Sequence, residues 1–293
     1  MSVLDVFESQ RPRLTRLAYR MLGSLADAED AVQDAWLRWG RADPTEVNDP
    51  AAWLVRATTR LCLDRLRAAR AAREAYKGPW LPEPLIEDPA DPVERAEDIS
   101  VAFLLALERL SPLERAVLIL HDVLDTDYPS IAETLDRSEI ACRQLLSRAR
   151  THVREARPRY GVTQDQVARI ATAFMDAMRR NDPAALSDLL AEDALLVTDG
   201  GGKRAAALRP LVGRADILHL IERLVWRGTW TAPTVMRIAR VNGQLGAVMA
   251  DAEGLTTLAV EVDDDGRLAT IYVVRNPDKL AGAAAWLKRG PPH

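Results

Sequence analysis

Arginine and glutamine side chains line one side of the helix predicted after Ser138, and such side chains can read the edges of DNA bases. The residues expected on this side are Arg143, Gln144, Ser147, Arg148 and Arg150. Arginine and glutamine form bidentate hydrogen bonds with guanine and adenine, whereas serine and further arginines can hold phosphate oxygens. This spacing therefore suits a helix that enters a major groove.

The element that positions these side chains is a predicted helix-turn-helix from Asp127 to Arg150. Its first helix carries an apolar stripe of Ile131, Ala132 and Leu135. Ser138 can cap the second helix, whose apolar side carries Cys142, Leu145 and Leu146. The alternative is an amphipathic helix pair with solvated arginines that binds nothing.

The distribution of charge favours nucleic acid as a partner, although the net charge of the 293-residue chain is −4. Residues 56–77 and 137–159 are rich in arginine, whereas residues 83–98 are acidic and proline-rich. The length allows two or three globular domains. We infer two basic, DNA-contacting modules joined by a linker, instead of one continuous basic surface.

Cysteine usage and hydropathy exclude several other classes of protein. Cys62 and Cys142 lack the spacing of metal ligands, and each is expected to be a small buried apolar residue in a reducing compartment. No apolar run approaches the roughly 18 to 20 residues of a membrane span, and the N-terminus has no apolar signal core. We therefore expect a cytoplasmic protein with no metal, no cofactor and no membrane partner.

Both basic modules are predicted to be entirely helical. Helices are expected over residues 5–23, from 27 to about 41 and over 51–76, which together form a small bundle. Residues 100–157 form the second module. There Ser111 and Glu114 make a capping box with Pro112 at the first helical position, so a helix begins at this point and leads into the helix-turn-helix.

Beyond residue 161 the pattern changes to helices followed by strands. Thr163 and Gln166 make a capping box before a helix at 167–180. A short helix at 183–190, a strand at 195–198 and a helix at 213–226 follow. The β-rich runs span 229–240, 245–250, 255–262 and 268–275, divided by Asn242-Gly243, Glu253-Gly254 and Asp265-Gly266. These dipeptides are hairpin signals, so the sequence predicts an α+β domain with a curved antiparallel sheet.

Residues 5–157 resemble a bacterial extracytoplasmic-function (ECF) sigma factor, the specificity subunit of RNA polymerase. The segments that carry the resemblance are GSLADAEDAVQDAWLRW, NDPAAWLVRATTRLCLDRLR, SPLERAVLIL and IAETL...CRQLLSRAR, in that order. The resemblance implies core RNA polymerase and promoter DNA as partners. The first module would be sigma region 2, which binds polymerase and opens the −10 element, and the second would be region 4, which reads the −35 element.

The resemblance also selects residues for each role. The polymerase-binding set is Asp27, Glu29, Asp30, Gln33, Asp34, Trp36 and Leu37. The −10 set, in the loop 42–50 and the following helix, is Asn48, Trp53, Arg56, Arg60 and Arg67; the −35 set is Ser138, Arg143, Gln144, Ser147 and Arg148. Core packing is the favoured alternative for Trp36 and Trp39. Asp136 stands at the turn where the family usually has glycine, and aspartate tolerates the left-handed conformation required there.

The C-terminal part resembles the SnoaL-like cone folds, related to ketosteroid isomerase, and three motifs resemble ECF group 41, whose members carry such a domain. The motif residues are Trp80, Leu81, Pro82, Glu83 and Pro84 in the linker, Asp199, Gly200, Gly201, Gly202 and Lys203 after the first strand, and Asn276, Pro277, Asp278, Lys279 and Leu280 near the end. This resemblance implies regulation in cis, with no separate anti-sigma protein. We expect Asp199 and Lys203 to pair with charged groups on a neighbouring module.

The expected fold class is multidomain, with two all-α sigma modules followed by an α+β SnoaL-like domain. The boundaries are 1–77 for region 2, 78–99 for the linker, 100–158 for region 4, 162–285 for the SnoaL-like domain and 286–293 for a tail. One alternative for the whole chain is a ligand-sensing helix-turn-helix regulator that does not bind polymerase. Another is an enzyme, but His219, Asp251, Glu253 and Glu261 form no obvious acid/base pair, so binding of an unknown small ligand is favoured over catalysis.

Overall fold

The computed structural model describes residues 3–42, 47–88, 99–156, 162–180, 182–226 and 233–290. The chain forms two compact units. Met1–Glu74 and Ala102–Pro158 make the first, called here the helical unit, and Ala75–Val101 and Arg159–His293 make the second, called here the α+β unit. Residues 75–101, which contain the predicted linker 78–99 and are called the linker from here on, thus belong to the same compact unit as the C-terminal part of the chain.

The N-terminal half of the helical unit is a three-helix bundle of α1 (Val3–Leu22), α2 (Leu25–Trp39) and α3 (Pro50–Glu74). Gly23, with φ 68°, lies between α1 and α2, and the hydroxyl of Ser24 accepts a hydrogen bond from the N–H of Asp27 to cap α2. The Asp49 carboxylate caps α3 by accepting from the N–H of Ala52. The three helices predicted from hydrophobic spacing therefore exist, with ends within two residues of the expected ones.

The second half contains α4 (Val101–Glu108), α5 (Pro112–Leu118), the π-helical turn η2 (Ile119–Val123), α6 (Tyr128–Leu135) and α7 (Glu139–Ala156). The capping box at the start of α5 is confirmed, since Ser111 and Glu114 exchange side-chain and backbone hydrogen bonds. Asp136 follows α6 in the left-handed conformation, with φ 53° and ψ 56°, as the sequence predicts.

The side chains of Arg115, Glu108 and Arg73 join the two halves of the helical unit. Arg115, only 3% exposed, donates to the carbonyl of Met21 at 2.6 Å and to Glu108 at 2.8 Å. Arg73 of α3 binds the other oxygen of Glu108 at 2.7 Å. The sequence suggested two separate modules, and it missed this packing because charges more than 30 residues apart carry no periodic signal.

The α+β unit is built on a seven-stranded sheet in the order β1-β4-β5-β6-β7-β2-β3. Its strands are β1 (Ile86–Glu87), β2 (Leu190–Asp199), β3 (Leu211–Val212), β4 (Val235–Val241), β5 (Gln244–Asp251), β6 (Gly254–Val262) and β7 (Leu268–Val274). Strands β4 to β7 form the predicted antiparallel meander, whereas β2 pairs in parallel with β7. Asn242 and Gly243 both have positive φ at the β4–β5 turn, as their hairpin signal required.

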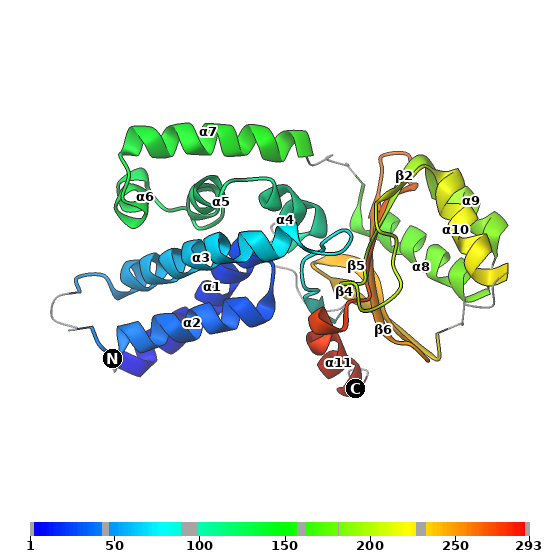
Figure 1. Ribbon diagram of the computed structural model, residues 1–293, viewed down its shortest axis with the longest axis horizontal. Helices are drawn as coiled ribbons and strands as arrows, with labels where there is room; N and C mark the ends of the chain where they lie inside the picture. Colours follow the sequence, from blue (N-terminus) through cyan, green and yellow to red (C-terminus); the bar gives the residue numbers. More distant parts are fainter. Residues whose placement is uncertain are drawn as a thin grey trace. The chain divides into compact units, whose positions relative to one another are not determined.

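Helices α8 (Gln164–Arg180), α9 (Pro183–Leu189) and α10 (Arg214–Trp226) gather on one side of the sheet (Figure 1). Their apolar side chains form one core with alternate residues of the strands. Phe174 and Ile217 from the helices, and Leu258 and Val260 from β6, belong to this core and are each at most 2% exposed. The period of two along β6 places Thr257 and Ala259 on the opposite face.

Leu81 to Pro84 of the linker lie on that opposite face, and α11 (Ala281–Lys288) is drawn on the same side of the sheet (Figure 1). Leu81, Pro82 and Pro84 line a remaining cavity of about 10 Å³ together with Ala259 and Tyr272, so the linker nearly fills the space. The expected fold class is confirmed, but the sequence missed β1, β3 and α11. In the described residues, no helix is long and apolar enough to cross a membrane.

Candidate functional site

Helix α7 separates buried from exposed residues as the predicted DNA-reading face requires. Cys142, Leu145, Leu146 and Ala149 are at most 8% exposed and face the core of the helical unit. The exposed residues between them are Arg143, Gln144, Ser147 and Arg148. The hydroxyl of Ser138 accepts from the N–H of Ala141 at 3.2 Å, which is the predicted cap. The structure therefore brings the whole −35 set to one end and one face of α7.

Local contacts hold two arginines of this face in defined positions. The guanidinium of Arg143 lies 4.0 Å from the centre of the Tyr128 ring and pairs with Glu139 at 3.0 Å. Arg148 pairs with Glu114 at 3.1 Å. Burial works to raise the pKa of Glu114, but hydrogen bonds from Ser111 and Arg148 outweigh it and lower that pKa. The cap of α5 and the Arg148 side chain of α7 thus share the Glu114 carboxylate.

Ile140, which is not among the residues expected from the sequence to read DNA, is 70% exposed in the first turn of α7. An isoleucine at this exposure gains nothing from the core of the helical unit. Apolar side chains at the N-terminal end of a recognition helix can contact the methyl group of thymine. The signal available in the sequence was a β-branched residue beside the cap, outside the apolar stripe of Cys142 and Leu145.

The residues expected to contact the −10 element are exposed or half-buried, and they lie from Asn48, just before α3, to Arg67 in its second half. Asn48 and Arg67 are exposed, and Trp53 is half-buried with its ring 5.3 Å from that of Trp39. Residues 43–46 of the expected reading loop lie outside the described residues. Trp39 is 3% exposed and donates to the carbonyl of Val3, so core packing is confirmed for this tryptophan.

Arg56 and Arg60 contact the C-terminal end of α6. Arg56 pairs with Glu133 at 2.5 Å. Arg60 donates to the backbone carbonyls of Thr134 at 2.9 Å and Glu133 at 3.0 Å. The last carbonyls of a helix lack intrahelical partners and carry partial negative charge, which favours cations there. The basic stripe expected on α3 is therefore partly engaged by the first helix of the helix-turn-helix.

The segment expected to bind polymerase is the outer side of α2. Its exposed members are Asp27, Glu29, Asp30, Gln33 and Leu37, with Leu37 50% exposed. Asp34 is half-buried and pairs with Arg65 at 2.7 Å. Trp36 is also half-buried, and the centre of its ring lies 4.8 Å from that of the Phe7 ring. An acidic surface with an exposed leucine is thereby available on this helix.

In the α+β unit, the three motifs of the linker, the β2 end and the β7 end meet around Asp199. This side chain is fully buried. It accepts from the hydroxyl of Tyr76 at 2.6 Å and from the N–H of Leu81 at 3.0 Å, and it pairs with Lys279 at 2.7 Å. Burial and the bond to Asp199 raise the pKa of Tyr76, so this hydroxyl remains a donor at neutral pH.

Lys279 and Asn276, which follow β7, also bind residues of the linker. The Lys279 ammonium donates to the carbonyl of Leu81 at 2.6 Å and lies 4.2 Å from the centre of the Trp80 ring. The Asn276 amide donates to the Tyr76 hydroxyl at 2.8 Å. We call Tyr76, Trp80, Leu81, Asp199, Asn276 and Lys279 the docking cluster.

The glycine loop after Asp199 is held by the same segment of chain. A side chain at Gly201 would come within 2.3 Å of the Asn276 amide, so only glycine fits there. Lys203 pairs with Asp278 at 2.6 Å. The partners found for Asp199 and Lys203 lie in the α+β unit, where the loop packs against the residues that follow β7. Pairing of these two residues with a neighbouring module stays a prediction.

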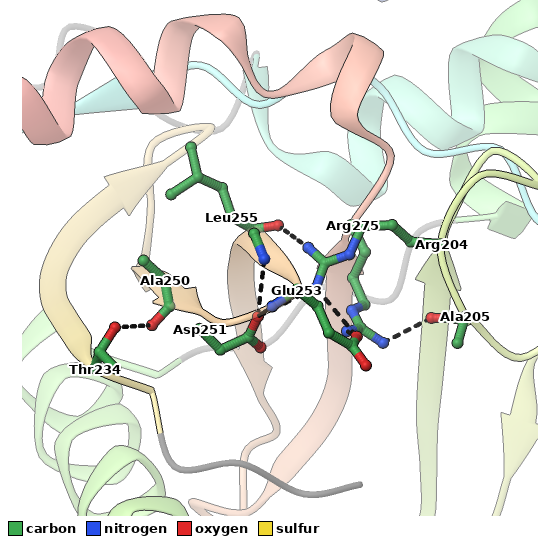
Figure 2. Close-up of polar contacts among 9 residues, drawn as sticks. Arg204, Ala205, Thr234, Ala250, Asp251, Glu253, Leu255 and Arg275 are labelled. Carbon is green, nitrogen blue, oxygen red and sulfur yellow. Dashed lines mark hydrogen bonds and ion pairs between the residues drawn. The ribbon is translucent and has the colours of Figure 1, made fainter.

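The carboxylates considered for catalysis are engaged in polar contacts, several of them drawn in Figure 2. Arg204 binds Asp251 and Glu253, each at 3.4 Å, and Arg275 binds Glu253 at 2.5 Å. Glu261 accepts hydrogen bonds from Gln244 and Tyr272, and His219 is exposed. These carboxylates serve to hold loops and strands together.

Two family models match the helical part of the chain. The model for Sigma-70 region 2 matches residues 6–72, and the model for Sigma-70, region 4 matches residues 100–153. These ranges cover most of α1 to α3 and of α4 to α7, respectively.

Relatives match nearly the whole chain. ECF RNA polymerase sigma factor SigJ of Mycobacterium tuberculosis (strain ATCC 25618 / H37Rv) is 37% identical over 98% of this chain and 96% of its own length. Probable ECF RNA polymerase sigma factor SigI of the same strain is 31% identical over 98% of both chains. The crystal structure of the M. tuberculosis SigJ protein aligns with a TM-score of 0.77 and 36% identity, over 95% of this chain and 98% of that one.

Proposed function

This chain belongs to the extracytoplasmic-function sigma factors of RNA polymerase, and from that premise we propose that its α+β unit regulates the sigma modules in cis by holding the linker between them. Full-length relatives with this activity support a sigma factor over the ligand-sensing regulator that does not bind polymerase. The family implies core RNA polymerase and promoter DNA as partners.

We assign the contacts with these partners to three surfaces of the helical unit. The exposed face of α7, from Ser138 to Arg148, reads the −35 element, since its arginines and glutamine suit base edges. Asn48, Trp53 and the arginines of α3 contact the −10 element, where an aromatic ring and cations can hold a displaced base and single-stranded phosphate. The acidic side of α2 binds the polymerase.

The observation that best supports regulation in cis is the buried pair of Asp199 and Lys279. This pair binds the linker on both sides of Trp80. The carboxylate receives Tyr76 and Leu81, and the ammonium binds the Leu81 carbonyl. Both linker segments around Trp80 are thus fixed by charges that come from the C-terminal part of the chain. A linker held in this way limits the separation of the modules that it joins, so no separate anti-sigma protein is required.

Transcription from a purified promoter with core polymerase tests this proposal. We expect Asp199→Asn to change transcript yield at least threefold while the ranking of promoter sequences stays the same. Asp193→Asn is the matched control, because Asp193 is an exposed carboxylate of the same strand. Equal yields for Asp199→Asn and the unmodified chain would remove the docking cluster from regulation.

Binding of the full chain to core polymerase provides the corresponding test of the α2 assignment. The titration is made at one salt concentration, because contacts between acidic residues and a basic partner are screened by ions. We expect Asp30→Asn with Leu37→Ala to weaken binding about tenfold. Unchanged affinity would move the polymerase contact away from α2.

A further inference from the structure

A hollow of about 390 Å³ lies in the α+β unit between the start of the linker and the glycine loop. The charged residues that line it are Lys77, Lys203 and Arg204, all cationic. Ala206, Ala207 and Leu208 form an apolar wall. Hollows of this size accommodate small organic molecules. The cationic and apolar side chains of the lining then indicate which class of molecule would bind.

The wall formed by residues 204–208 is fixed by the polar contacts of Figure 2. Arg204 donates to the carbonyl of Leu255 at 2.5 Å besides its ion pairs with Asp251 and Glu253. Arg275 donates to the carbonyl of Ala205 at 2.7 Å. At the other end of the wall, the Thr198 hydroxyl accepts from the N–H of Ala207 at 2.7 Å. The hollow is therefore preorganised, which reduces the entropy lost when a ligand binds.

Within the described residues, the hollow offers one ammonium without an ion pair, that of Lys77, and one unsatisfied N–H of Arg204, whose charge is paired with Asp251 and Glu253. The Arg204 side chain is 10% exposed, and its Nε is buried with no hydrogen-bond partner in the described part of the chain. Within the same part, no ion pair of Lys77 is found. Lys203 and its partner Asp278 are both more than half exposed, and such surface pairs contribute little.

Glycine at position 202 lets Lys77 lie across the loop. A Cβ atom there would come within 3.1 Å of the Lys77 side chain, and Gly202 has φ 71°. Both the conformation and the space at this position therefore favour glycine. The linker start and the glycine loop approach each other closely at the edge of the hollow.

We propose that this hollow binds a small organic phosphate. Lysine ammonium groups hold phosphate oxygens as point charges, and the wall of Ala206 to Leu208 contacts an apolar part of the ligand. This inference rests on the proposed regulation in cis, because Lys77 immediately follows Tyr76 of the docking cluster. A ligand that contacts Lys77 only when the linker is docked shifts the chain toward the docked state.

Titration calorimetry with inorganic pyrophosphate on the full chain at low ionic strength tests the site. We expect binding that Lys77→Gln and Lys203→Gln each weaken at least fivefold. Lys288→Gln removes one exposed charge from the same unit, outside the hollow, and should leave the affinity unchanged. Hydrogen exchange should slow in residues 198–208 when pyrophosphate is added.

Three outcomes would overturn the site: no binding, equal weakening by Lys288→Gln, or weakening by Arg143→Ala with no effect of Lys77→Gln. The last would place the pyrophosphate on the DNA-reading helix. The titration requires neither polymerase nor promoter, so its failure is separate from failure of the regulation, which Asp199→Asn tests by transcription.

Discussion

Along α7, the side chains proposed to read DNA are exposed, and those that pack into the core are buried. Leu146 and Ala149 are at most 1% exposed, whereas Ile140 and Arg143 face solvent one turn apart. The Arg143 guanidinium stacks on Tyr128, which restricts its motion before DNA arrives. A restricted side chain loses less entropy on binding, so this arginine is the first choice for a base contact.

Arg143→Ala should weaken binding to the −35 element by about 1 to 3 kcal/mol, the usual effect of losing a base-reading arginine. Binding to unrelated duplexes should change much less. Competition assays with the specific and an unrelated duplex measure both quantities at one salt concentration. Equal losses on both would show that Arg143 contacts phosphate.

For Ile140 we predict a different effect, because its partner would be the methyl group of a thymine. Replacing each thymine of the −35 element in turn by uracil removes one methyl at a time. One of these changes should weaken binding of the unmodified chain about fivefold and leave Ile140→Ala unaffected. If every uracil duplex weakened both proteins alike, Ile140 would have no role in reading thymine.

At the scale of elements, α5 and α7 depend on one carboxylate, that of Glu114. It closes the capping box with Ser111 and pairs with Arg148. Burial opposes ionisation, but these hydrogen bonds prevail and the pKa lies below its ordinary value of 4.5. A lowered pKa in the folded state adds stability above the unfolded pKa, and this stability is lost as the pH falls through the folded pKa.

Glutamine can still close the capping box, so Glu114→Gln removes mainly the charge that pairs with Arg148. It should lower the free energy of unfolding by about 0.2 to 1 kcal/mol at pH 7. The difference from the unmodified chain should shrink as the pH falls below the ordinary value of 4.5, because the Glu114 carboxyl becomes protonated first in the unfolded and then in the folded chain. Urea unfolding between pH 3 and 7 measures it, with Glu155→Gln as an exposed control. A difference independent of pH would assign the effect to packing.

Helices α3 and α6 form the other coupled pair of elements. Arg56 and Arg60 of α3, both expected to contact the −10 element, bind Glu133 and the last carbonyls of α6. If these arginines contact the −10 element, DNA must compete with α6 for them. Weakening the contacts with α6 should then increase the affinity for DNA.

Glu133→Gln should increase the affinity for a single-stranded −10 oligonucleotide about threefold to tenfold. Glu8→Gln, which removes an exposed carboxylate paired with Arg11, should have no such effect. Fluorescence anisotropy with a labelled oligonucleotide measures both. An unchanged or reduced affinity for Glu133→Gln would mean that Arg56 and Arg60 do not contact this DNA.

The sequence was most informative where structure is local. Helix ends at Ser24 and Ser111, the left-handed Asp136 and the Asn242-Gly243 turn all follow from a few neighbouring residues. The motif residues were recognised, but their partners were not, since Asp199 meets Tyr76 across 123 positions. Strand β1 was missed because two residues are too few to show a period.

At the scale of the whole molecule, the docking cluster ties the linker to residues far along the chain. The Tyr76 hydroxyl bonds directly to the buried Asp199 carboxylate, so their contributions to stability should not be independent. A double-mutant cycle with Tyr76→Phe and Asp199→Asn should give a coupling energy of about 1 to 3 kcal/mol in urea unfolding. Tyr76→Phe paired with Asp193→Asn should be additive. Additivity of the first pair would contradict the cluster.

The order in which the chain is synthesised gives the docking cluster a further consequence. Leu81 and its partner Lys279 are 198 residues apart, and α7 ends at Ala156, long before Lys279 is made. More than 100 residues remain to be translated when both sigma modules are complete. At roughly 5 to 20 residues per second, their synthesis takes several seconds or longer. A nascent or prematurely terminated chain therefore carries both modules but cannot close the cluster. Ribosome stalling between α7 and Lys279 would yield the sigma modules without the unit that we propose regulates them.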